Sequence, residues 1–260
     1  MAIKTLTQAN LTWVNIDHID AEALTHLRTN FNFHPLDFED LQSEHETPKI
    51  DVYKNYIFII LQFPHWQAEE RKVVTQVLYI FIGDNYLITL QQMKSKELKN
   101  FFYRCMNNRK VKADWMNSGS GYLLYRIVES LFHNTRPILN NIGQQISRLE
   151  RSVFGGEQDS GVILEAARHR SNLLALHRIV DPTHYIINTL ANADRPFLGE
   201  STTLYFEDVN DYVSNLRAII DAYKETLKGM HITVESLINR RTNKIITVLT
   251  VISVGLMPIN

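Results

Sequence analysis

The sequence contains a single cysteine, Cys105, among its 260 residues. One thiol excludes an intramolecular disulfide framework and a cysteine-based zinc cluster, and it is typical of a protein kept in a reducing compartment. Net charge is also lacking, because 27 basic side chains are matched by 28 acidic ones. A chain so balanced has no overall electrostatic attraction for nucleic acid. We therefore expect most of the chain to lie in the cytoplasm and to have no nucleic-acid partner.

Recognisable catalytic motifs are absent as well. The sequence has no His-Glu-x-x-His metal box, no Walker lysine, no dinucleotide fingerprint and no Gly-x-Ser-x-Gly nucleophile elbow. His169 and His177 do not have the helical spacing that joint coordination of a metal requires. We therefore expect that the chain is not an enzyme.

An uncharged, mostly apolar run occupies residues 245–259. It follows Arg240, Arg241 and Lys244, as is typical of a segment that enters a membrane from the cytoplasmic side. Its 15 residues are fewer than the roughly 20 that a helix needs to cross the hydrocarbon, so we interpret it as the start of a membrane helix. The alternative is a buried C-terminal helix, which is also typical of a run of this length. Residues 1–10 are polar and do not resemble a signal peptide.

The first part of the chain alternates between strand-like and helix-like segments. The predicted strands are residues 12–16, 55–63, 73–82 and 86–91, and the predicted helices are residues 21–30 and 97–106. Gly83, Asp84 and Asn85 join the last two strands, because these residue types tolerate the left-handed backbone of a hairpin turn. The sequence thus predicts an α/β domain, with a mixed β-sheet and flanking helices, over residues 1–116.

After this domain the strand signal disappears. Residues 117–121 read NSGSG and predict a flexible linker rather than a phosphate loop. Apolar residues then recur at helical spacing over residues 124–153 and 163–190. This pattern predicts two long helices that form an antiparallel pair within residues 117–195.

The last part, residues 196–260, is predicted to be one very long helix. Beyond Gly199 the first proline is Pro258, and a helix over residues 201–259 would be on the order of 88 Å long. Such a rod suits a stalk that runs from a cytosolic domain into a membrane. It would need neighbouring helices or other subunits to bury its apolar stripe.

Three local patterns occur in the order in which a known protein family has them. The first is HPLDFEDL at residues 34–41, followed by PKI at residues 48–50 and YIFI at residues 56–59, with Thr47 where the family has arginine. The second, GYLLYRI at residues 121–127, resembles the start of the family's first long helix. The third runs from TNK at residues 242–244 to Met257 and Pro258, and it is similar to the start of the pore-lining helix. The chain therefore resembles the CorA family of divalent-cation transporters, and within that family it resembles the cytosolic domain with the opening of the first transmembrane helix.

The resemblance implies a funnel-shaped homopentamer in the cell membrane, with α/β cytosolic domains around five stalk helices that continue into the pore. It also implies transport of Mg²⁺, together with Co²⁺ or Ni²⁺. Zinc-transporting relatives share the architecture, so Zn²⁺ stays open as the ion. The Gly-Met-Asn triplet of the family would lie just beyond Asn260.

Carboxylates are the candidate metal ligands. In the family, an aspartate at the position of Asp40 pairs across the subunit interface with one at the position of Asp208, and Glu39 and Asp211 lie beside them. Mg²⁺ is a hard cation that accepts one or two carboxylates while it keeps several waters. The alternative is that these acids only stabilise a helix N-terminus and solvate a helix face.

The candidate pore-lining residues form one stripe of the last helix. Five of them recur at steps of three and four, namely Asn243, Ile246, Thr250, Ser253 and Met257. Leu249, next to Thr250, is the sixth candidate. Apolar members would form constrictions and polar members would offer oxygens to a hydrated ion. The alternative is that they only pack helices together.

These patterns together predict the cytosolic Mg²⁺-sensing and gating domain of a CorA-like channel. Two alternatives stay open, namely the same domain of a zinc-transporting relative, and a soluble helical scaffold whose apolar C-terminus binds a partner helix.

Overall fold

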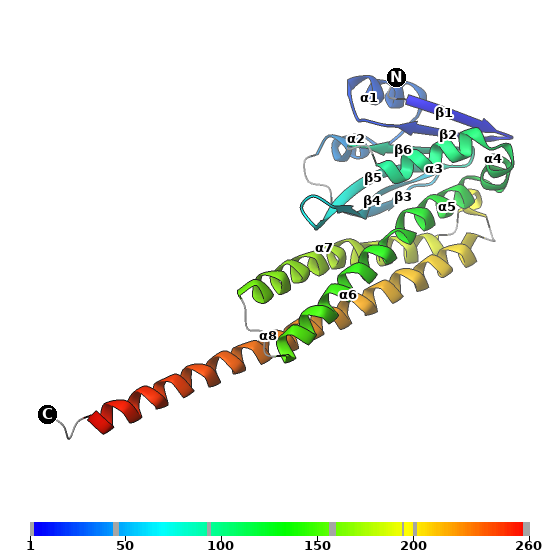
Figure 1. Cartoon of the computed structure of the whole chain (residues 1–260). Helices are drawn as coiled ribbons and strands as arrows, with labels where there is room; N and C mark the ends of the chain where they lie inside the picture. The colour runs from blue at the N-terminus through cyan, green and yellow to red at the C-terminus, as the bar shows by residue number, and fades with distance from the viewer. Residues whose placement is uncertain are drawn as a thin grey trace. The chain divides into compact units, whose positions relative to one another are not determined.

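A computed structural model describes residues 3–43, 47–92, 95–155, 160–193, 195–199 and 202–256 (Figure 1). Its contacts divide the chain into two compact units. The first comprises Met1–Ile138 with Leu174–Ala218, and the second comprises Leu139–Leu173 with Ile219–Asn260. The division predicted along the sequence, at residues 116 and 195, stays a prediction.

The first unit contains a six-stranded mixed sheet, which confirms the predicted α/β fold. Its strands are β1 (Ile3–Gln8), β2 (Leu11–Ile16), β3 (Lys49–Val52), β4 (Tyr56–Gln67), β5 (Lys72–Gly83) and β6 (Tyr86–Gln91). Their order in the sheet is β1-β2-β6-β5-β4-β3, and only the β2–β6 pair is parallel. The predicted hairpin of β5 and β6 is confirmed. The edge strands β1 and β3 were not predicted.

Helices cover both faces of this sheet, so the central strands are apolar on both sides. The helices before residue 120 are α1 (Ala21–Asn30), α2 (Pro35–Gln42), α3 (Lys96–Asn107) and α4 (Arg109–Met116). Phe58, Ile60 and Phe81 belong to one core cluster with the buried side chains of α1 and α2. On the other face, the Trp13 ring lies 4.8 Å from the Phe102 ring of α3.

The prediction of a flexible linker over residues 117–121 is wrong for its last two residues. Ser120 and Gly121 are the buried first residues of α5 (Ser120–His133), and only a short turn precedes them. The Ser120 hydroxyl donates a hydrogen bond of 2.6 Å to the Gly83 carbonyl. A Cβ on Gly121 would lie 2.5 Å from the Leu198 carbonyl oxygen, so glycine here permits close packing rather than flexibility.

The first long helix is not continuous, contrary to the prediction. It is divided at Asn134 into α5 and α6 (Thr135–Phe154). Pro137 explains the division, because its ring would clash with the carbonyl of His133 and it has no N–H to donate. The second predicted helix is confirmed as α7 (Ser160–Ala191), and a short 3₁₀ turn, η1 (Pro196–Leu198), precedes the last helix.

The predicted long final helix is confirmed as α8 (Thr202–Leu256), which is coloured yellow to red in Figure 1. Its 55 residues make it the longest element of the described chain, about 83 Å at 1.5 Å per residue. Among the described residues, no helix combines the length and the apolarity that a membrane crossing needs. Ser201 and residues 257–259, included in the prediction, lie outside the described residues.

Candidate functional site

The start of α2 is fixed over the beginning of β4 by hydrogen bonds around His34. His34 is the N-cap, and its Nδ1 accepts a hydrogen bond of 3.3 Å from the Leu36 N–H. Pro35 follows at the first helical position, where its fixed φ suits a helix start. The His34 N–H donates to the Tyr56 hydroxyl at 2.8 Å, so the first residue of β4 holds the helix N-terminus.

Asp37 is the buried acid of this site, with none of its surface exposed. Each of its carboxylate oxygens accepts a tyrosine hydroxyl, from Tyr56 at 2.6 Å and from Tyr53 at 2.8 Å. Burial raises the pKa of Asp37, and the two hydrogen bonds offset that rise only in part. Burial and the bond to Asp37 raise the pKa of Tyr53 and of Tyr56, so both hydroxyls remain donors at physiological pH.

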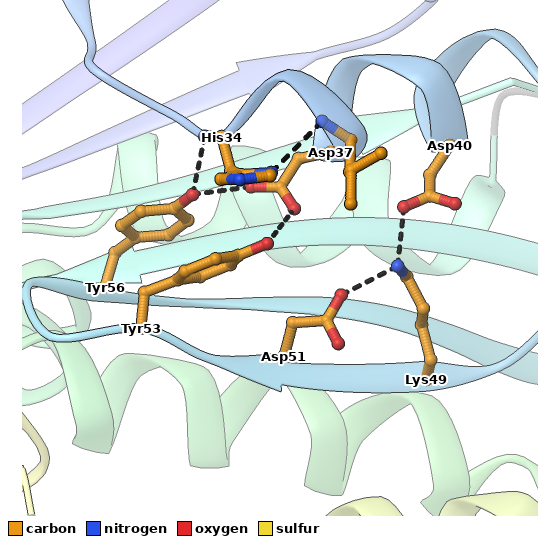
Figure 2. Close-up of polar contacts among 8 residues, drawn as sticks. His34, Asp37, Asp40, Lys49, Asp51, Tyr53 and Tyr56 are labelled. Atoms are coloured by element: carbon orange, nitrogen blue, oxygen red, sulfur yellow. Dashed lines mark hydrogen bonds and ion pairs between the residues drawn. The ribbon is translucent and has the colours of Figure 1, made fainter.

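Asp40 lies one turn further along α2 and is paired within its own chain (Figure 2). Its carboxylate lies 2.6 Å from the Lys49 ammonium, which also contacts the Asp51 carboxylate at 2.7 Å. Lys49 and Asp51 are two residues apart in β3, so their side chains lie on the same face of the strand. Their register partners in β4 are Ile60 and Phe58. Both side chains therefore point to the face of the sheet that α2 covers.

The three aspartates form a compact acidic cluster. Asp37, Asp40 and Asp51 each offer a carboxylate oxygen, and these oxygens lie within 4.8 Å of one another. Partial burial lowers the pKa of Lys49, but its hydrogen bonds to Asp40 and Asp51 outweigh this effect and raise the pKa overall. The cluster thus holds three carboxylates against one firmly protonated ammonium.

Glu39, Asp208 and Asp211, the other predicted metal ligands, are exposed. Glu39 lies on α2, whereas Asp208 and Asp211 share a face of α8 opposite the buried side chains of Phe206 and Val209. Among the contacts of the described residues, none joins Asp40 to Asp208. Within one chain Asp40 lies with Lys49 and Asp51. The predicted pairing with Asp208 joins two subunits and stays a prediction.

The predicted pore stripe lies on an exposed part of α8. Its described members are Asn243, Ile246, Leu249, Thr250 and Ser253, and Met257 lies outside the described residues. The hydroxyls of Thr250 and Ser253 donate to the carbonyls of Ile246 and Leu249, each at 2.8 Å. Both hydroxyls therefore keep only their acceptor capacity for an ion or a water.

Sequence reasoning missed the polar partners of Asp40. Lys49 and Asp51 were not predicted as site residues, and neither were Asp37, Tyr53 and Tyr56. One signal was available, since Lys49 and Asp51 are two residues apart and would share a face of any strand. The hydrogen bonds of Asp37 had no comparable signal, because they join segments 16 and 19 residues apart.

Comparison with known proteins agrees with the motifs. The family model of the CorA-like Mg²⁺ transporter protein matches residues 8–260. The cobalt/magnesium transport protein CorA of Thermotoga maritima is 24% identical over 253 residues, which are 95% of this chain and 70% of that protein. The complete structure of the CorA magnesium transporter from Methanocaldococcus jannaschii has a TM-score of 0.81 at 23% identity, and the match covers 95% of this chain and 76% of that one.

A further solved structure shares the fold at lower identity. The ZntB cytoplasmic domain from Vibrio parahaemolyticus has a TM-score of 0.68 at 13% identity, with 90% of each chain covered. The family match over nearly the whole chain confirms the resemblance inferred from the motifs, and with it the expectation that the chain is not an enzyme. The chain belongs to the family of CorA-like Mg²⁺ transporter proteins.

Proposed function

We propose that this chain is the cytosolic sensing and gating part of a divalent-cation channel in the cell membrane, and that Mg²⁺ is the ion it senses. One observation carries the proposal. Asp208 and Asp211 are exposed on one face of α8 and have no ion-pair partner among the described residues. Two uncompensated carboxylates three residues apart repel each other, and a hard divalent cation relieves that repulsion.

The second ligand comes from a neighbouring copy of the chain. In a ring of identical subunits every copy presents the same two surfaces, and the resemblance to the family implies that Asp40 of one copy meets Asp208 of the next. We take the ring to be a pentamer, as the resemblance to the family implies. Glu39 directly precedes Asp40, and Asp211 lies three residues beyond Asp208; both would bind the waters that Mg²⁺ retains.

Gating follows from a difference in affinity between two states of the ring. When cytosolic Mg²⁺ is high, the bridging ions stabilise the closed arrangement, and when Mg²⁺ leaves, the facing carboxylates repel and the ring loosens. The ion needs to favour the closed state by about 1 to 3 kcal/mol per site pair. Two carboxylates and water bind Mg²⁺ weakly, which suits a sensor that empties at physiological concentrations.

The conducting part begins in α8. We place Asn243, Ile246, Leu249, Thr250, Ser253 and Met257 along the pore, where the continuation of α8 enters the membrane. The name of the Thermotoga relative includes cobalt as well as magnesium, so Co²⁺ and, by its similar size and charge, Ni²⁺ are further expected cargoes. Carboxylate and water ligands suit the hard ion Mg²⁺, whereas Zn²⁺ is more often held by cysteine and histidine.

Thermal melting and limited proteolysis of the assembled protein, with and without Mg²⁺, test the sensor. Asp208→Asn should remove most of the Mg²⁺-dependent protection, because one carboxylate and water hold the ion poorly. The same variant should be more stable than wild type without metal, because the repulsion with Asp211 is gone. Asp84→Asn, which neutralises an exposed acid in the β5–β6 turn, is the control. Full protection in Asp208→Asn would contradict the proposal.

A further inference from the structure

Lys49 occupies the place that a metal ion would take beside Asp40. Its ammonium lies 2.6 Å from the Asp40 carboxylate and 2.7 Å from that of Asp51 (Figure 2). The ammonium also lies over the Phe58 ring, 5.5 Å from the ring centroid. Its position is therefore set by the sheet and by two carboxylates together, unlike that of a freely moving surface lysine.

An ammonium and a divalent cation compete for the same oxygens of Asp40. A cation bound directly to Asp40 would take the oxygen that now accepts from Lys49, and it would place a charge of +2 within a few ångströms of a charge of +1. At such a separation the repulsion reduces affinity on the order of tenfold even in a highly screened, water-like environment. Lys49 therefore opposes cation binding at Asp40 by both occupancy and charge.

Asp51 makes this competition reversible. When a cation takes Asp40, Lys49 keeps its contact with Asp51 and loses only one of its two ion pairs. The lysine does not have to leave the site, and it returns to Asp40 as soon as the cation departs. The side chains of Asp40 and Lys49 retain 30% and 33% of their accessible surface, so solvent reaches the pair, while the Oδ2 atom of Asp40 that contacts Lys49 is covered in the paired state.

We propose that Lys49 is a tethered competitor that lowers the affinity of Asp40 for divalent cations and so sets the Mg²⁺ concentration at which the sensor fills. This inference rests on the proposed function, since it assigns a regulator to the same acid. The alternative is that Lys49 is purely structural and only ties β3 to α2. The two roles differ in the Mg²⁺ concentration that gives half of the maximal protection, because a structural lysine changes stability without changing that midpoint.

The test is a Mg²⁺ titration of thermal stability at constant ionic strength, with calorimetric titration of Mg²⁺ as a second measurement. Lys49→Gln should shift the midpoint to a concentration on the order of tenfold lower. Lys54→Gln is the matched control, because Lys54 is exposed five residues away and makes no ion pair with a described residue. It should leave the midpoint unchanged. In Lys49→Gln combined with Asp40→Asn the gain should disappear, because it acts through Asp40.

Each outcome is decisive. If Mg²⁺ protects the wild type but Lys49→Gln leaves the midpoint unchanged, the inference is overturned and the proposed function stays intact. The same holds if Lys54→Gln shifts the midpoint as much as Lys49→Gln does. Absence of Mg²⁺ protection in both wild type and Lys49→Gln overturns the proposed function and the inference together. If Lys49→Gln does not fold, Lys49→Arg replaces it, and retention of the positive charge should keep the midpoint at or above the wild-type value. A midpoint well below it would overturn the inference.

Discussion

The Tyr56 hydroxyl connects two groups that have few other partners, so its removal should be costly. It donates to the buried Asp37 carboxylate at 2.6 Å and accepts from the His34 N–H at 2.8 Å. In Tyr56→Phe both groups lose this partner. Water can replace it at His34, which is exposed, but not readily at Asp37, which has no accessible surface. The loss is therefore mainly that of a hydrogen bond to a buried charge, about 1.5 to 3 kcal/mol.

Tyr53→Phe is the internal comparison, because it removes the other hydroxyl donor of the same carboxylate. Tyr53 is half-buried, and its hydroxyl donates to Asp37 at 2.8 Å. Its loss leaves the same buried carboxylate without one donor, so it should cost a similar amount, about 1.5 to 3 kcal/mol. Urea denaturation at pH 7.5 measures both variants, with changes in midpoint compared at equal slope. A cost below about 0.5 kcal/mol for either variant would refute the argument that burial of Asp37 determines the penalty.

Two further predictions concern Asp37 and the glycines. Burial raises the pKa of Asp37, so the native state binds the proton of this carboxyl more tightly than the unfolded state does. The contribution of this carboxyl to wild-type stability therefore falls as pH rises from about 4 through the raised pKa. Asp37→Asn should remove this pH-dependent contribution to the free energy of unfolding. Denaturation of wild type and variant between pH 4 and 7 should therefore show stability curves that converge at the acidic end. Parallel curves would contradict the prediction. Gly121→Ala should destabilise the protein by about 1 to 3 kcal/mol, since the new Cβ would meet the Leu198 carbonyl oxygen. Gly229→Ala should instead stabilise α8 by up to about 1 kcal/mol, because a Cβ there would have nothing within 4 Å. Melting temperatures that move in the same direction for both alanine variants would contradict this account of the two sites.

The main architecture could be predicted from the sequence because its signals are local. The run of β-branched and aromatic residues in β4 and β5, and the turn at Gly83, predicted a hairpin that the structure contains. The absence of proline before Pro258 predicted α8 in the same way. Each signal depends on residues that are neighbours in the chain, so no tertiary information was needed.

The errors occurred where tertiary contacts decide the conformation. Ser120 and Gly121 have the composition of a linker, but the carbonyls of Gly83 and Leu198, distant in sequence, enclose them at the start of α5. The short strand β3 has only four residues and was missed for a related reason. Its pairing with β4, rather than its own composition, makes it a strand.

The charge state of the candidate site depends on that same pairing. Alternation alone implies that Lys49 and Asp51 share a face of β3, but it does not say which face. The register of Lys49 opposite Ile60 directs both side chains to the layer that contains Asp40. A shift of one residue would turn the ammonium to the opposite face and leave Asp40 without its counter-ion. The sheet register, which the apolar core of β4 and β5 enforces, therefore also determines whether Asp40 meets a cation as a free carboxylate or as one already paired.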